Sequence, residues 1–263
     1  MLLVDVHCHL NHERFKDDLD QVIERAKQAG VKAIICNGVN SATNKEVLKL
    51  AEKYDIVKPS LGIYPIDALN IQLPHLDEVG LTKDKFLDVD KEIKFIEKNK
   101  NKIIAIGEVG LDFKYLKEHE QKQRENFQKI IDLAKRIDKP LIVHSRNAEQ
   151  TVLEMLESNN VKKVVLHSFG GRKSLIKKGT ELGYHFSIPP VVKRLQHFEI
   201  VISLVPLIQL LTETDAPWLS PYPEKRNEPS FVIESIKKIA EVKKMTEEEV
   251  ANNVFMNYQQ LFG

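Results

Sequence analysis

The sequence predicts an α/β fold, namely a (β/α)8 TIM barrel with an extra C-terminal helix and an insertion after the third strand. Three observations lead to this prediction. Short apolar runs alternate with longer amphipathic stretches along the whole chain, and there are eight of each. The apolar runs are nearly continuous, as expected for parallel strands that are buried on both faces. Eight successive β-then-α units close most economically as a barrel.

The expected strands are short apolar runs, each followed by a helix. In chain order they span residues 2–6, 32–36, 57–61, 103–106, 140–143, 163–166, 184–187 and 208–212. The intervening stretches carry apolar residues at helical spacing, as Phe127, Ile130 and Ile131 do in one of them. These stretches predict helices over residues 19–29, 44–54, 89–99, 119–136, 149–158, 173–182, 193–201 and 230–241. Residues 246–262 are expected to form the extra C-terminal helix.

One stretch interrupts this alternation. Residues 65–88 are long for a connection between a strand and a helix, and they contain Pro74 and scattered polar residues. Loops of this length are usually functional lids or local elaborations, so we interpret this one as an insertion at the barrel mouth. The sequence contains no linker, low-complexity run or internal repeat, and residues 1–263 are therefore expected to form a single domain.

The composition is that of an ordinary globular chain with a formal net charge of +1. A nearly neutral protein is not expected to coat duplex DNA through a broad basic surface, although nucleic acid and small substrates both remain open. The two cysteines, Cys8 and Cys36, are expected to be free thiols in a reducing cytosol. The first residues lack a basic secretion-signal region, and no apolar run approaches the ~18 residues of a membrane span. We therefore expect a cytoplasmic protein, and the sequence implies no protein partner.

Potential metal ligands stand at the ends of the predicted strands. His7 and His9 follow the first strand, and residues i and i+2 of a strand point to the same face, which Asp5 shares. The ends of four other strands carry Glu108, His144, His167 and Asp215. In a (β/α)8 barrel such strand ends converge on one mouth. Imidazole and carboxylate suit Zn, Mn, Fe, Ni or Mg, and six donors, with a carboxylate able to bridge, indicate two ions.

Each of these residues alone also has an ordinary structural interpretation. A histidine at a strand end, such as His144 or His167, is more often structural than a ligand. Glu108 could be a turn acid, and Asp215 could cap a helix or form an Asx turn. A single metal centre accounts for all six positions together, whereas the structural interpretations must each hold independently.

Six motifs extend this pattern over the whole chain. They are DVHCHL (5–10), GEVGLD (107–112), VHSR (143–146), LHSFGG (166–171), TETDAPWLSP (212–221) and RNEPSFV (226–232). With these motifs in this order, the chain resembles the TatD family of metal-dependent deoxyribonucleases, within the amidohydrolase-like metallohydrolases. The resemblance implies that Glu108 bridges two ions. It further implies that one ion is bound by His7, His9 and Asp215, and the other by His144 and His167.

The chain departs from the family pattern after the third predicted strand. The family has Gly-Ile-His-Pro-His there, and Tyr64 and Ile66 replace both histidines. Tyr64 can exchange a hydrogen bond with a phosphate, but it cannot act as a histidine-like general acid near neutral pH. The segment 220–226 is shorter than the basic run of the family, although Lys225 and Arg226 remain. These changes leave the expected ligands intact and bear on the choice of substrate.

The resemblance implies a metal-dependent hydrolase that cleaves phosphodiester bonds of DNA. We expect a 3′–5′ exonuclease acting on single strands or DNA ends, in which two divalent metal ions (Mg, Mn, Zn or similar) activate a water. Asp215 and Glu108 would be the catalytic residues, and Asp215 would accept or steer the proton of the water. The candidate substrate contacts are Arg146, Tyr64, Lys225 and Arg226.

The substrate contacts have ordinary alternatives. Arg146 could pair with a nearby acid, and the two basic residues at 225 and 226 could simply be solvated. Phe113 and Tyr115 could stack on a base, although aromatic residues near a barrel mouth more often serve in packing. We interpret Trp218 as an anchor of its loop.

Two other functions remain open at this point. A related metallohydrolase would use the same ligands to open a small cyclic amide or lactone, or to cleave a small phosphoester. Tyr64 and the insertion favour this alternative. A barrel without catalysis would act as a binding or scaffold protein, and the intact set of six ligands argues against it.

Overall fold

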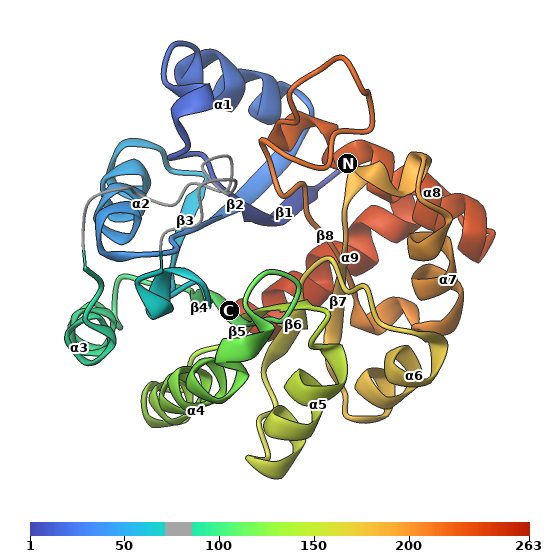
Figure 1. Cartoon of the computed structure of the whole chain (residues 1–263). Coiled ribbons are helices and arrows are strands. Elements are labelled where there is room, and N and C mark those ends of the chain that lie inside the picture. The colour runs from blue at the N-terminus through green and yellow to red at the C-terminus, as the bar shows by residue number, and fades with distance from the viewer. Residues whose placement is uncertain (72–85) are drawn as a thin grey trace.

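A computed structural model describes residues 1–71 and 86–263 and shows a barrel of eight parallel strands surrounded by helices (Figure 1). Each strand pairs in parallel with the next strand of the sequence. The strands are β1 (Leu3–Cys8), β2 (Val31–Asn37), β3 (Val57–Leu61), β4 (Ala105–Asp112), β5 (Leu141–Arg146), β6 (Val164–Leu166), β7 (His185–Ile188) and β8 (Leu210–Thr212). The predicted (β/α)8 barrel is therefore confirmed.

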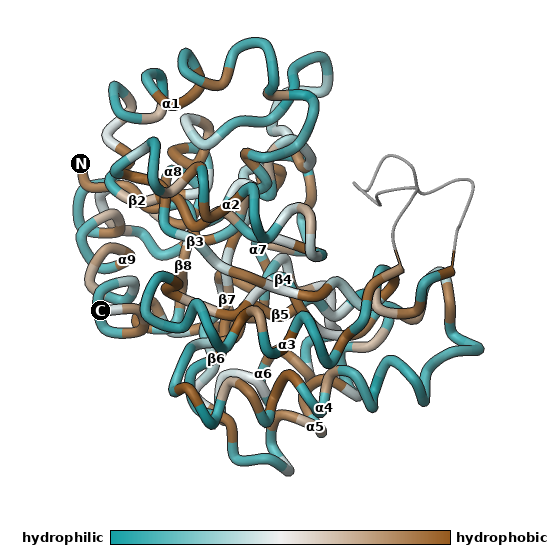
Figure 2. Tube along the Cα trace, turned by 90° about the vertical axis from the view of Figure 1, so that its left-hand side faces the viewer, coloured by the Kyte–Doolittle hydropathy of each residue, from teal (hydrophilic) through white to brown (hydrophobic). Residues whose placement is uncertain are grey.

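The helices connect the strands and pack their apolar faces against the barrel. They are α1 (Leu19–Gln28), α2 (Ser41–Lys53), α3 (Val89–Lys98), α4 (Glu120–Ile137), α5 (Glu149–Ser158), α6 (Lys173–Glu181), α7 (Gln196–Leu204) and α8 (Ile233–Lys243). In α4, Phe127, Ile130 and Ile131 are buried, as their helical spacing predicts. Figure 2 shows hydrophobic segments in brown along the strands and hydrophilic segments in teal along the outer helices. Among the described residues, no helix has the length and apolar character needed to cross a membrane.

An additional helix, α9 (Glu247–Phe262), ends the chain as predicted. Thr246 caps it: its side chain accepts a hydrogen bond from Glu249 N, and the Glu249 carboxylate accepts one from Thr246 N (2.9 Å). This capping box satisfies two amide groups that a helix start otherwise leaves free. The side-chain amide of Asn257 donates to Leu207 O and Leu210 O (both 2.8 Å), which fixes α9 to the start of β8.

The barrel is joined at a seam between β8 and β1. The segment that follows β8 is bonded to the end of β1, because Asp215 N donates to His7 O (2.8 Å) and His9 N donates to Ala216 O (2.8 Å). The two ends of the barrel sheet therefore meet through residues that include three of the expected metal ligands. This seam brings opposite ends of the sequence into contact.

Several elements differ in length from the prediction. β1 and β4 extend through the motifs at their ends, so that His7 and Glu108 lie within strands instead of following them. β8 is shorter than predicted, because a 3-10 helix over Leu207–Gln209 precedes it. α7 begins later than predicted, after a 3-10 helix over Pro190–Lys193. Apolar periodicity does not mark such ends, since backbone hydrogen bonding decides where an element begins.

Only part of the predicted insertion at residues 65–88 lies in the described part of the chain. A short 3-10 helix covers Asp67–Leu69. Asn70 and Leu87 are joined by two hydrogen bonds, from Leu87 N to Asn70 Oδ1 (2.6 Å) and from Asn70 Nδ2 to Leu87 O (3.1 Å). Residues 72–85 lie outside the described residues, so the role of the insertion remains a prediction.

Candidate metal centre

The two histidines of the first motif converge at the mouth of the barrel. Between Asp5 and Cys8, β1 has one residue more than the paired segment of β2, which marks a β-bulge. Bulges are frequent beside active sites because they re-aim side chains. The Nε2 atoms of His7 and His9 lie 3.2 Å apart, and both residues are buried. The two imidazoles therefore face the same point.

Glu108 reaches the same point from β4. The register of β4 against β5 shifts between Ile106 and Val109, which indicates a second bulge over residues 107–108. Gly110 lets the two strands approach each other, because its φ is +137° and a Cβ there would lie 2.0 Å from His144 O. The second glycine of the GEVGLD motif is thus required by sterics beside the glutamate.

The carboxylate of Glu108 lies between two pairs of histidines. Its Oε2 is 3.5 Å from His7 Nε2 and 3.4 Å from His9 Nε2. Its Oε1 is 2.9 Å from His144 Nδ1 and 3.6 Å from His167 Nε2. His144 lies in β5, and His167 directly follows β6. Each carboxylate oxygen therefore faces one pair of imidazoles, which is the arrangement that a bridging ligand requires.

Asp215 approaches from the seam in an uncommon backbone conformation. Its φ is +55°, in the left-handed region that Asp tolerates better than most residues. Its Oδ1 lies 3.4 Å from His7 Nε2 and 3.5 Å from His9 Nε2. The buried Asn227 fixes this loop, since its side-chain amide donates to Thr214 O (2.7 Å). The side chain of Asp215 is 17% exposed and is the most accessible of the six expected ligands.

Three subsets of the six residues have the spacing of a metal site. Within each subset, one ligand atom per residue lies within 4.8 Å of the others; the subsets are His7–His9–Glu108, Glu108–His144–His167 and His7–His167–Asp215. Imidazole nitrogen and carboxylate oxygen are donors that divalent ions such as Zn or Mn accept. The third subset combines ligands that the resemblance assigns to different ions, so the partition between two ions stays a prediction.

The ionisable groups of this centre perturb one another strongly. Burial alone would lower the pKa of His9, but the carboxylates of Asp215 and Glu108 raise it to about 9. The same two carboxylates raise the pKa of His7 well above its usual value. Burial would raise the pKa of Glu108 and Asp215, yet the imidazoles hold both below the ordinary range. The centre therefore favours positive charge between its carboxylates, which fits a divalent cation.

Two buried carboxylates outside the predicted ligand set hold His144 and His167. Asp112 Oδ2 lies 3.0 Å from His144 Nε2, and Glu213 Oε2 lies 3.1 Å from His167 Nδ1. The hydroxyl of Ser187 also donates to Glu213 Oε2 (2.5 Å). A carboxylate on the second ring nitrogen fixes the tautomer and orientation of a metal-binding histidine. Sequence reasoning missed both acids as site residues, although each stands in a motif beside an expected ligand.

Asp5, which shares the predicted face of the first two histidines, serves the seam. Its Oδ1 accepts hydrogen bonds from Thr214 N (2.9 Å) and His7 N (3.2 Å), and its Oδ2 accepts one from the Thr214 hydroxyl (2.5 Å). Complete burial raises the pKa of this carboxyl to about 7. Asp5 therefore fastens β1 to the loop that carries Asp215, and it belongs to none of the three subsets.

Arg146 is a predicted substrate contact that lies beside the expected ligands and is partly exposed. Its side chain is 40% exposed, and its NH1 is 3.6 Å from Asp112 Oδ2. Its guanidinium lies 5.6 Å from the ring centroid of Tyr115, which is half-buried. Phe113 instead belongs to the buried main core, so of these two aromatic residues only Tyr115 has exposed surface to offer a base.

Lys225 is exposed, whereas Arg226 is engaged within the fold. The guanidinium of Arg226 donates to both carboxylate oxygens of Asp18 (2.8 and 2.7 Å) and lies 4.4 Å from the ring centroid of Phe15. Lys225 Nζ lies 5.5 Å from the ring centroid of Tyr222. Arg226 is thus engaged within the fold, and the geometry gives its predicted phosphate contact no support.

Tyr64 is enclosed, which is at odds with its predicted contact to a phosphate. It is 4% exposed, and its hydroxyl donates to Asp112 Oδ2 (3.0 Å). Burial and the nearby carboxylates of Asp112 and Glu108 raise the pKa of the phenol well above its usual value. The hydroxyl faces the carboxylate of Asp112 inside the barrel mouth instead of the solvent, and this is why a phosphate cannot easily reach it.

Trp218 packs beside the expected ligand His9. Its ring meets the imidazoles of His9 and His12 edge-on, with centroid separations of 5.4 and 5.0 Å. The side-chain amide of Asn227 donates to Trp218 O (2.6 Å). These contacts agree with the interpretation of Trp218 as an anchor of its loop.

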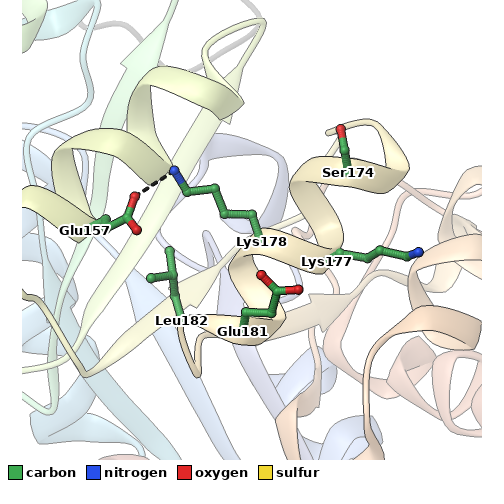
Figure 3. Close-up of a pocket in the computed structure, with 6 residues that line it drawn as sticks. All are labelled: Glu157, Ser174, Lys177, Lys178, Glu181 and Leu182. Carbon is green, nitrogen blue, oxygen red and sulfur yellow. Dashed lines mark ion pairs between the residues drawn. The ribbon is translucent and has the colours of Figure 1, made fainter.

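A separate pocket of about 510 Å³ lies on the outer wall of the barrel between α5 and α6 (Figure 3). Its lining residues are Glu157, Ser174, Lys177, Lys178, Glu181 and Leu182. Lys178 Nζ and Glu157 Oε2 form an ion pair at 2.6 Å across it. None of the six expected ligands lines this pocket, so we do not connect it with the metal centre.

Comparisons with known proteins identify the family of the chain. The family model of TatD-related DNases matches residues 4–263. A human protein named deoxyribonuclease TATDN3 is 38% identical over 265 residues, which cover 99% of this chain and 94% of that protein. An uncharacterized metal-dependent hydrolase of Bacillus subtilis, YabD, is 34% identical over 267 residues, covering 99% of each chain. The crystal structure of YJJV, a TatD homologue from Escherichia coli, superposes with a TM-score of 0.85 at 27% identity, over 99% of this chain and 97% of that one. This chain therefore belongs to the family of TatD-related DNases.

Proposed function

We propose that this chain is a metal-dependent hydrolase that cleaves phosphodiester bonds of DNA. The observation that carries the proposal is the position of Glu108, whose two carboxylate oxygens face different pairs of histidines at distances of 2.9 to 3.6 Å. Two relatives add support, since one is named a deoxyribonuclease and the other a metal-dependent hydrolase. Phosphodiester hydrolysis is the reaction that joins these two descriptions.

The site would hold two divalent ions of the Mg, Mn or Zn type. Glu108 would be shared between them, with His7, His9 and Asp215 on one side and His144 and His167 on the other. Such ions, when bound, supply an activated water and offset negative charge on a phosphate. Asp112 and Glu213 would keep the histidines on the second side in the tautomer that leaves one ring nitrogen free for a ligand bond.

Asp215 would accept or steer the proton of the attacking water. Its side chain is the most exposed of the expected ligands, at 17%. An aspartate carboxylate is ionised at neutral pH. An ionised carboxylate that water can reach is able to act as a general base.

The substrate would be a single strand or a DNA end, shortened from its 3′ terminus. A chain with a net charge of +1 is suited to gripping few phosphates. Arg146 would bind one phosphate beside the ligands, and the half-buried ring of Tyr115 would carry a base. Cleavage with the 3′ oxygen as leaving group would release 5′ nucleotides one at a time.

An assay on end-labelled single-stranded DNA tests the proposal. The chain is first stripped of metal with a chelator, and Mn²⁺ or Mg²⁺ is then added back. We expect no cleavage in the stripped chain and a ladder that shortens from the 3′ end after the addition. Parallel panels of lactones, cyclic amides and small phosphoesters detect the alternative chemistry, and turnover there without cleavage of DNA contradicts the proposal.

The variant Asp215→Asn removes the proposed basic carboxylate but keeps the size of the side chain, so it tests catalysis without disturbing the fold. We expect kcat to fall by about 10²–10⁴-fold, the contribution typical of general acid–base catalysis, with cooperative unfolding retained. Asp90→Asn is the matched control, because Asp90 is an exposed carboxylate paired with Lys129 on the outer helices (2.7 Å). Full activity of the Asp215 variant under metal-controlled conditions would refute its role.

We also propose a cytoplasmic location. Cys8 and Cys36 are paired positions of β1 and β2, and both are buried free thiols. Two neighbouring thiols that stay unbonded are expected in a reducing compartment. The proposed reaction requires no protein partner.

A further inference from the structure

Tyr64 stands where the family pattern has a histidine, yet it lies away from solvent. It follows β3 and is 4% exposed. Together with Val39, Ile66 and Leu116 it forms a small apolar cluster that is separate from the main core. A side chain enclosed in this way is poorly placed to touch a nucleic-acid phosphate, so its polar group must serve another purpose.

Two contacts link Tyr64 to the metal centre. Its hydroxyl donates to Asp112 Oδ2 (3.0 Å), and the same oxygen lies 3.0 Å from His144 Nε2. Its ring meets the imidazole of His144 edge-on, with 5.0 Å between the centroids and an interplanar angle of 67°. The other nitrogen of that imidazole, Nδ1, is 2.9 Å from Glu108 Oε1. Tyr64 therefore touches both the ligand and the carboxylate that orients it.

We propose that Tyr64 is a positioning residue that holds Asp112, and through Asp112 the imidazole of His144, in the orientation that binds a metal ion. This inference rests on the proposed function, because it takes His144 as a ligand. It replaces the role of substrate contact that the sequence alone predicts for Tyr64.

A fixed donor matters here because Asp112 has a competing partner. Gln123 holds its backbone, donating to Asp112 O (2.8 Å) and accepting from Asp112 N (2.8 Å), and Lys114 N donates to its Oδ1 (3.0 Å). The position of the remaining oxygen, Oδ2, is therefore left to its side-chain partners. NH1 of Arg146 lies 3.6 Å from Oδ2, the oxygen that Tyr64 and His144 share. Without the hydroxyl, the guanidinium would draw this oxygen away from the imidazole, since charged donors form the stronger hydrogen bonds.

The experiment is a calorimetric titration of Mn²⁺ into the metal-free full chain, repeated for Tyr64→Phe, Asp112→Asn and the double variant. Phenylalanine keeps the ring and removes only the hydroxyl. We expect Tyr64→Phe to weaken one Mn²⁺ binding step by about threefold to tenfold, less than the loss of about 10–100-fold typical for a direct partner of a ligand such as Asp112. Because Tyr64 acts through Asp112, its substitution should have no further effect in the Asp112→Asn chain.

Tyr54→Phe is the matched control. Tyr54 is also buried, and its hydroxyl donates to the carboxylate of Asp20 (2.5 Å) where α2 leads into β3, at the other end of the barrel from the ligands. Loss of this tyrosine–carboxylate hydrogen bond should leave Mn²⁺ affinity unchanged. Thermal unfolding of each variant checks that the fold is retained, and if Tyr64→Phe does not fold, Asp112→Asn alone must still weaken Mn²⁺ binding.

Two results with the variants would overturn the inference: unchanged Mn²⁺ affinity in Tyr64→Phe, and additive effects in the double variant. Unchanged Mn²⁺ affinity together with a raised KM for DNA would restore the substrate contact. The titration contains no DNA, so a wild-type chain that binds Mn²⁺ without cleaving DNA refutes the proposed function alone. A wild-type chain that binds no Mn²⁺ refutes both.

Discussion

The two sides of the metal centre are built differently. On the seam side, formed by His7, His9 and Asp215, His9 Nδ1 faces a backbone carbonyl, that of Asn37 (3.1 Å), and His7 Nδ1 has no hydrogen-bond partner among the described residues. On the backed side, formed by His144 and His167, a buried carboxylate faces the second nitrogen of each imidazole. The sides touch each other, because the rings of His7 and His167 stack with 3.8 Å between centroids.

If each side binds an ion as proposed, this difference makes the backed side the better prepared of the two. A backing carboxylate fixes the tautomer of an imidazole and makes its other nitrogen a better donor. On the backed side, each histidine and its carboxylate lie within a strand or directly after one: Asp112 in β4, His144 in β5, His167 after β6 and Glu213 after β8. The seam side instead depends on the loop that carries Asp215, which hydrogen bonds hold against β1. We therefore expect the backed side to bind its ion more tightly, and the seam side to be more easily disturbed.

The largest effect is expected from the residue that both sides share. Glu108→Ala should lower kcat for DNA by more than about 10³-fold, beyond the loss of 10²–10³-fold typical for one electrostatic stabiliser, because both sides lose a ligand. Calorimetry with Mn²⁺ should show that both binding steps are weakened while unfolding stays cooperative. If one Mn²⁺ binding step is unaffected, Glu108 binds an ion on one side only, and the two sides do not share a ligand.

Removing one backing carboxylate should act on one side only. Glu213→Gln keeps the size of the side chain and should weaken a single Mn²⁺ binding step by about 10–100-fold. Glu92→Gln is the matched control, since Glu92 is also a buried carboxylate, which accepts from Asn44 Nδ2 (2.8 Å) away from the ligands. Equal weakening of both steps by Glu213→Gln would mean that the two sides are not separate.

The seam side should respond to pH in the metal-free chain. His9 has a pKa of about 9 against an ordinary 6.5, and a raised pKa stabilises the fold below the unfolded value and loses this effect as pH rises through the folded one. The Tm of the chelator-treated chain should therefore fall between pH 6.5 and 9. Saturating Mn²⁺ should stabilise the chain more as pH rises, because ligands bind in the deprotonated form.

His9→Asn provides the control for this trend. The variant lacks one imidazole with a raised pKa and keeps that of His7, so its metal-free Tm should change less, though still fall, over the same range. A metal-free wild-type chain whose Tm increases from pH 6.5 to 9 would contradict the assigned electrostatics.

The smallest effects concern two arginines, one on each side. Arg146 lies beside Asp112 of the backed side, and Arg146→Gln should reduce the salt slope of DNA binding by about 1, as expected for one phosphate contact.

Arg226 pairs with Asp18 near the loop of the seam side. Arg226→Gln should lower the free energy of unfolding by about 1 kcal/mol, because the ion pair with the half-buried Asp18 lies near the surface, and it should leave the salt slope unchanged. Fluorescence anisotropy over a range of salt concentrations measures the salt slope of both variants, and a reduced slope for Arg226→Gln would reverse the assignment.

Local patterns predict the barrel and the residues of the centre, but not the bulges. The alternation of apolar runs and amphipathic stretches is a property of neighbouring residues, and parallel strands then allow few arrangements. The extra residue of β1 before Cys8 and that of β4 before Val109 become visible only when each strand is paired with its neighbour. A bulge breaks the alternation on which the reading of a single strand depends.

The sequence by itself determined the strand order and which imidazoles and carboxylates stand at the strand ends, because both follow from short-range spacing. Only the tertiary structure decided what each polar group faces. It turned Tyr64 toward Asp112, engaged Arg226 with Asp18 and set Asp112 and Glu213 behind two histidines. These partners come from different strands and loops, and a hydrogen bond depends on distances of a few ångströms that only the closed barrel defines.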